Sequence, residues 1–178
     1  MKKNNFKGQV WIETVVYTLI GLAIMAILLS ISMPQIEKIK DKSIITQTTD
    51  SLNVLNSKVS EAEEARGSIR VVNFKIAKGR LELNSSGNKV IYTLENTKLE
   101  LSQIGESIKE GNVIMETKKS GDKFNIFLTM DYNNTLNLTY NGKKETKVLQ
   151  AGTAPYKIIL ENTGYDASRK INIDFNLG

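Results

Sequence analysis

The fold of this chain is decided by the stretch GQVWIE at positions 8–13 and by the apolar run behind it, from Thr14 to Met33. Three lysines precede this stretch, at positions 2, 3 and 7, and Glu13 is the only charged residue between Gly8 and Ile36. The chain beyond this run is polar and rich in β-forming residues. The sequence therefore predicts an apolar helix with one carboxylate at its entrance, followed by a folded head.

The apolar run is long enough to cross a membrane. Thr14 to Ile36 is 23 residues, which as a helix reaches ~34 Å and exceeds a hydrocarbon core. A secretory signal has only about 7–15 apolar residues, so a conventional secreted protein cut after Ser30-Ile31-Ser32 is the weaker interpretation. The basic residues at the start predict a single-pass protein with a cytoplasmic N-terminus.

Helical periodicity continues beyond the apolar run. Pro34 is expected to end or kink the first segment, and Gln35 to Arg66 is helical again, with Gly67 as a stop signal. One apolar stripe runs along this second segment, formed by Ile45, Leu52, Leu55, Val59 and Ala62. We favour one continuous or gently kinked helix over two helices joined flexibly at residues 30–35.

From Ser68 onward the apolar residues alternate with polar ones, which is typical of strands. About nine short strands with turns between them predict an antiparallel β-sandwich or barrel-like head. Asn141-Gly142 predicts a two-residue hairpin closed by Val148, whereas residues 105–111 are expected to form a loop or a short helix. The chain is therefore an α+β protein with a leader at 1–8, an apolar helix at 9–36, an amphipathic continuation at 37–67 and a β-rich head at 68–178.

The composition excludes several kinds of chemistry. The 178 residues include no cysteine and no histidine, which removes disulfides, thiolate nucleophiles and imidazole ligands. The net charge of +5 includes the three lysines of the leader, and no basic patch indicates nucleic-acid binding. Phosphate-loop, dinucleotide and nucleophile-elbow motifs are absent from the sequence. We expect no enzymatic activity, no cofactor and no metal.

The acidic residues do not alter this expectation. The carboxylates at 61, 63 and 64 cluster on the predicted helix, where a solvated face is the simpler interpretation. Asp122, Asp131 and Asp166 fall in turns, without the spacing of a calcium loop.

Three sequons mark candidate N-glycosylation sites at Asn84, Asn133 and Asn137. Each falls in a predicted turn or on the polar face of a strand, where a glycan would be tolerated. Their use depends on export of the head.

Glu13 is the most informative single residue. A carboxylate inside a membrane helix is costly, though less so near its end, so Glu13 is either solvated at the interface or paired. If the chain is cut between Gly8 and Gln9, Gln9 gains a free α-amine four residues before Glu13. In a bundle of such helices the carboxylate could pair with the ammonium of a neighbouring copy and fix the axial register.

These residues resemble the class III signal peptide of archaeal type IV pilin-like proteins and archaellins. The resemblance covers residues 5–36: a basic leader, Gly8 before Gln9, Glu13 as the fifth residue of the processed chain, and an uninterrupted apolar helix. Many archaeal members have serine and tyrosine where this chain has Trp11 and Thr14. The resemblance implies that a prepilin peptidase cuts after Gly8, and that the helix stays in the mature protein as the filament core.

The resemblance further implies a structural subunit of a type IV pilus-like or archaellum-like surface filament, serving adhesion or motility. Its partners would be other copies of the chain, the membrane, the peptidase and the assembly machinery. It would be stored in the cell membrane and end in an extracellular filament, as a glycoprotein if the sequons are used. The alternative is a single-pass, membrane-anchored surface binding protein that does not polymerise.

Overall fold

The computed structural model describes residues 6–166 and 168–178, with side chains from Trp11 onward. The chain divides into two compact units, residues 1–39 and 40–178. One helix, α1 (Phe6–Glu63), belongs to both units and passes through Pro34 without interruption. The expectation of a single helix is therefore confirmed over the described residues.

The second unit is the head. It contains the last part of α1 and ten strands in the part of the chain that the structure describes. These are β1 (Ile69–Phe74), β2 (Arg80–Asn84), β3 (Lys89–Thr97), β4 (Ser107–Glu110), β5 (Val113–Ser120), β6 (Lys123–Asp131), β7 (Leu136–Tyr140), β8 (Thr146–Gln150), β9 (Tyr156–Tyr165) and β10 (Ile171–Leu177).

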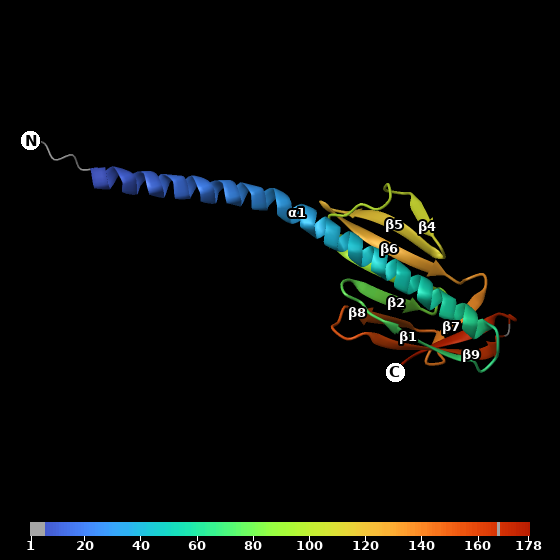
Figure 1. Cartoon of the computed structure of the whole chain (residues 1–178). Coiled ribbons are helices and arrows are strands. Elements are labelled where there is room, and N and C mark those ends of the chain that lie inside the picture. Colours follow the sequence, from blue (N-terminus) through green and yellow to red (C-terminus); the bar gives the residue numbers. More distant parts are fainter. Residues whose placement is uncertain (1–5, 167) are drawn as a thin grey trace, which may run out of the picture. The chain divides into compact units, whose positions relative to one another are not determined.

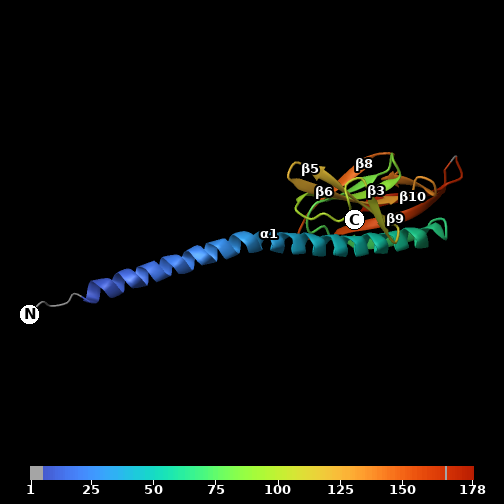
Figure 2. The ribbon, with the colours of Figure 1, turned by 90° about the horizontal axis from the view of Figure 1, so that it is seen from above.

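The strands form two sheets. The smaller has the order β1-β9-β10-β7 and the larger β4-β5-β6-β3-β2-β8. All pairings are antiparallel except that between β7 and β10, which is parallel. In both views the head's part of α1 runs along one side of the strands (Figure 1, Figure 2). The α+β class, with a long helix and a β-rich head, is confirmed.

The predicted stripe of α1 is the face that enters the core. Leu52, Leu55, Val59 and Ala62 are fully buried and Ile45 nearly so. They share one apolar core with the inner faces of both sheets, including Phe74, Tyr92 and Phe175. Each fully buried large side chain contributes about 1.5–3 kcal/mol, so this stripe holds the helix on the head.

The end of the helix is capped by a side chain that sequence reasoning did not find. The helix ends at Glu63, slightly before the predicted Arg66. Asn162 of β9 donates from its carboxamide to the carbonyl oxygen of Ala62 at 2.9 Å. The backbone N–H of Gly67, at a φ of 79°, donates to the carbonyl of Asn162. The first bond satisfies a carbonyl that a helix C-terminus leaves without a partner, and the second ties the residue after the helix to β9.

Three details of the strand prediction are wrong. Residues 107–110 form β4 rather than a loop or helix, paired with β5 across a turn at Gly111. The alternating pattern also extends over Leu99 and Leu101 and predicts a strand there, but these residues lie outside the strands and pack on the core. Asn141-Gly142 makes a tight turn with both φ angles positive, but it closes only a bridge between Tyr140 and Lys143. β7 then stays with β10, and β8 crosses to the larger sheet beside β2.

Candidate membrane and assembly segment

The helix of the first unit exposes its apolar side chains all around. Every residue from Trp11 to Ile39 is exposed except the half-buried Pro34. Trp11 is 70% exposed and Tyr17 72%, although large apolar side chains normally enter a core. This exposure indicates association of the segment with lipid or with other chains.

This helix also meets the requirements of a membrane span. Within residues 6–166 and 168–178, α1 is the only helix long and apolar enough to cross a bilayer, judged by length and composition. Its most apolar window has a mean hydropathy of 2.4 and is not buried. The same helix can thus serve as a membrane span or as a surface for self-association.

Two hydroxyl groups of the segment are satisfied by carbonyls of their own helix. Thr18 donates its hydroxyl to the carbonyl of Thr14 at 2.8 Å, and Ser30 donates to the carbonyl of Ile27 at 2.7 Å. Buried hydroxyls are costly in an apolar medium unless they are hydrogen-bonded. Pro34 lacks an N–H, so the backbone carbonyl of Ser30 has no helical donor. This carbonyl lies close to the end of the apolar run.

The predicted processing residues lie at the start of the helix. Gly8 and Gln9 have helical backbone, and the side chain of Glu13, four residues after Gln9, is exposed. The side chains of residues 6–10 and the whole of residues 1–5 lie outside the described part of the chain, including Lys2 and Lys3. Cleavage after Gly8 and the register role of Glu13 stay predictions.

The three sequons lie in different environments. Asn84 ends β2, and its carboxamide oxygen accepts from the N–H of Gly87 at 2.8 Å while its nitrogen donates to Glu82. Asn137 donates from its amide nitrogen to Asn172 at 2.8 Å across the parallel pair. Asn133 is exposed in the turn between β6 and β7, where its backbone N–H donates to Asp131. Asn133 is thus the most accessible acceptor of the three, and its glycosylation stays a prediction.

A buried carboxylate on α1 marks the start of the head. Asp41 is only 4% exposed, and it accepts hydrogen bonds from the hydroxyl of Thr97 and the ammonium of Lys78, both at 2.6 Å. Next to it, the hydroxyl of Tyr92 donates to the carbonyl of Lys78, and burial raises the pKa of Tyr92 to about 12. Sequence reasoning missed this cluster, although Asp41 precedes Ile45 by four residues and so belongs to the buried stripe.

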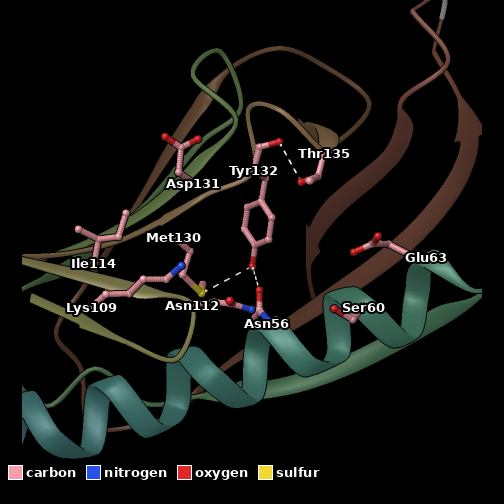
Figure 3. Close-up of a pocket in the computed structure, with 10 residues that line it drawn as sticks. All are labelled: Asn56, Ser60, Glu63, Lys109, Asn112, Ile114, Met130, Asp131, Tyr132 and Thr135. Atoms are coloured by element: carbon pink, nitrogen blue, oxygen red, sulfur yellow. Dashed lines mark hydrogen bonds between the residues drawn. The ribbon is translucent and has the colours of Figure 1, made fainter.

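A polar pocket of about 290 Å³ lies near the opposite end of the head's helix. α1, the β4–β5 hairpin and the β6–β7 turn supply its lining: Asn56, Ser60, Glu63, Lys109, Asn112, Ile114, Met130, Asp131, Tyr132 and Thr135 (Figure 3). Tyr132 reaches down to α1 and donates to the carboxamide oxygen of Asn56 at 2.8 Å. Burial raises the pKa values of both Tyr132 and Glu63.

The other acidic residues make local contacts. Glu61 bonds to Lys58 and Arg70, and the hydrogen bond from Lys58 is the main cause of its lowered pKa. Asp131 has a lowered pKa because the N–H of Asn133, and also Lys89, bond to its carboxylate. Among the described residues, no group of three or more carboxylates could hold a metal ion.

No family model, curated protein or solved structure matches this chain. The architecture itself, a long apolar N-terminal helix followed by β-sheets, is consistent with that of pilin-like proteins. The functional argument therefore rests on the helix and on the head.

Proposed function

We propose that the chain is a structural subunit of a type IV pilus-like or archaellum-like surface filament. The observation that carries this proposal is the contrast along α1. From Ile45 to Ala62 the helix buries its apolar stripe in the head, whereas from Trp11 to Ile39 it exposes apolar side chains on all sides. A helix covered all around by identical helices is what a filament core requires.

The chemistry of the segment suits storage in lipid before assembly. The hydroxyls of Thr18 and Ser30 are satisfied by their own helix, so moving from lipid to a helix bundle breaks no side-chain hydrogen bond of theirs. The apolar surface is covered both in lipid and in the bundle, so moving the helix from one to the other buries little additional apolar area. An assembly motor must therefore extract the helix. In the bundle, Glu13 pairs with the new α-amine of Gln9 on a neighbour.

A second function is favoured by the pocket of the head. A single-pass surface protein could bind a polar ligand there without polymerising, and it would need neither cleavage nor Glu13. The filament interpretation is preferred because it explains both the cleavage motif and the position of Glu13. Adhesion and motility are both compatible with such a filament.

The state of the N-terminus distinguishes the two functions. In cells that contain a prepilin peptidase, intact-mass analysis should show loss of residues 1–8 and a mature chain that begins at Gln9. Gly8→Val should block this cleavage and leave the chain in the membrane fraction. Retention of residues 1–8 in the native protein would remove the main support for the filament.

The register role of Glu13 has its own test. Glu13→Ala should insert into the membrane normally but lower the yield of filaments seen by negative-stain microscopy, because the amine of Gln9 loses its partner. Asp50→Ala, an exposed acid on the same helix, is the matched control and should leave assembly unchanged. Normal filament yield from Glu13→Ala would rule out the register role alone.

A further inference from the structure

The contacts of Asp41 show which segments lie together at one end of the head. Its carboxylate joins Lys78 and Thr97, and Thr97 is the register partner of Phe124 at the start of β6. Phe124 in turn pairs with Lys119 of β5. The β5–β6 turn therefore lies at the same end of the head as the point where α1 enters it. Both views place this turn level with the start of the head's helix (Figure 1, Figure 2).

This end of the head is basic. Five exposed lysines gather there, which we call the basic end: Lys40, Lys42, Lys78, Lys119 and Lys123. The nearby acids are Asp41, already bonded to Lys78, and Asp122 in the turn, while Glu95 is paired with Arg80 and Glu100 follows Lys98 by two residues. Residues 40–178 have 20 lysines and arginines against 17 aspartates and glutamates. Without the five lysines, Asp41 and Asp122, 15 basic and 15 acidic residues remain, so these seven residues together account for the net charge of residues 40–178.

The chain tethers the basic end close to the end of the apolar run. Lys40 follows Ile36 by four positions, and this length of chain can span at most about 14 Å even when fully extended. If residues 14–36 cross the bilayer, as the proposed function requires, the first residues of the head lie at the outer membrane–water boundary. Electrostatic attraction to a charged surface acts over about 8–10 Å at physiological salt.

We propose that the basic end of the head docks on an anionic membrane surface through these lysines while the subunit is still in the bilayer. The ligand is the phosphate of lipid headgroups. Ammonium groups attract such a surface as point charges and need no shaped cavity. Docking holds the unassembled head against the bilayer, and assembly releases it. This inference rests on the membrane stage of the proposed function, not on the filament stage.

The test uses energy transfer in reconstituted full-length protein. Because the chain has no cysteine, Ser120→Cys in the β5–β6 turn accepts a single dye, and a membrane-impermeant dye labels only outward heads. Vesicles carry an acceptor lipid and contain either phosphatidylcholine alone or equimolar phosphatidylcholine and phosphatidylglycerol. Transfer from position 120 should be higher in the anionic vesicles and should fall when salt is raised.

Matched variants make the test specific. Lys119→Gln with Lys123→Gln should remove the difference between the two vesicles, with the docked fraction falling on the order of fivefold for each lysine. Lys109→Gln with Lys143→Gln removes the same charge from two other exposed positions and should leave the difference intact. A dye at Asn134→Cys, in the turn after the far end of β6, should show little dependence on vesicle composition.

The outcomes separate the two proposals. If the protein floats with both kinds of vesicle and energy transfer from position 120 is equal in them, the docking is overturned. The membrane stage of the proposed function is unaffected by this outcome. Transfer that persists in Lys119→Gln with Lys123→Gln overturns the role of the basic end. Failure to float with either vesicle overturns both the membrane stage and the docking.

Discussion

At the scale of single residues, polar groups decide how α1 is held. Asp41 lies on the buried stripe of the helix, where its carboxylate is bonded to Thr97 and Lys78. Asn162 holds the other end of the same stripe through the carbonyl of Ala62. The apolar side chains between them supply most of the burial, and the two polar contacts fix the position of the helix along its axis.

Replacing Asp41 by alanine tests this view. The hydroxyl of Thr97 loses a charged acceptor at a buried site, so Asp41→Ala should lower the free energy of unfolding by about 2 kcal/mol. Asp50→Ala on the exposed face should change it by less than about 0.5 kcal/mol. Urea unfolding of the detergent-solubilised chain, followed by tyrosine circular dichroism, measures both. Equal losses in the two variants would contradict a locking role for Asp41.

Two acids of the pocket should respond to pH in opposite directions. The pKa of Asp131 is lowered by its hydrogen bonds, so its stabilisation is present above its ordinary pKa of 3.8 and is lost as the pH falls. The pKa of Glu63 is raised by burial, so its carboxyl weakens the fold as the pH rises above 4.5.

Neutral amide substitutions of Asp131 and Glu63 test these two pKa shifts. Asp131→Asn should be less stable than the wild type at neutral pH, and Glu63→Gln should be more stable. Both differences should shrink as the pH falls toward 3, because the wild-type carboxyls take up protons. Urea midpoints measured from pH 3 to pH 7 check this. Parallel pH profiles for either variant and the wild type would contradict the assignment.

At the scale of elements, local patterns predicted the helix and most of the strands but not the sheet order. Alternation of apolar residues placed β6 and β9, because one face of each is buried. Asn141-Gly142 gave the predicted turn geometry without the predicted hairpin, because β7 finds its partner in β10, about 30 residues later in the sequence. β4 has no buried residue, so no apolar alternation could reveal it. The pocket and the Asp41 cluster depend on such long-range pairing and were not predictable.

The connection between β1 and β2 should be intolerant of a side chain. A Cβ on Gly79, at a φ of 80°, would lie 2.3 Å from the backbone oxygen of Thr93. Gly79→Ala should therefore cost about 3 kcal/mol or more. Gly67 has nearly the same φ of 79° with open space around it, and Gly67→Ala should cost only about 1 kcal/mol. Similar unfolding midpoints for the two variants would contradict the close approach.

At the scale of the whole molecule, the two units differ in whether they bury their own apolar side chains. The head has its own core, and the buried stripe of α1 begins only at Asp41 and Ile45. The segment before it exposes its apolar side chains. The apolar run was the part most fully predictable from sequence, because length and hydropathy alone define it.

A fragment of residues 40–178 should therefore fold and remain monomeric without detergent. Its circular dichroism should retain the signals of the buried Tyr92, Tyr132 and Tyr140, because all 27 buried apolar residues among those that the structure describes lie after Lys40. The chain from Gln9 onward should aggregate or require detergent, as size-exclusion chromatography would show. An unfolded or aggregated fragment would contradict the independence of the head.

The pairing of β7 with β10 has a consequence for the order of events during synthesis. β10 ends at Leu177, and it separates β7 from β9 in the smaller sheet. β1, although it comes first, pairs with β9 near the other end of the sequence. While β10 is still inside the ribosome, the smaller sheet lacks the strand that joins β7 to β9, so the head cannot close. The long helix, in contrast, is synthesised before every strand of the head. The head is therefore completed only after β10 has left the ribosome, long after α1 has emerged.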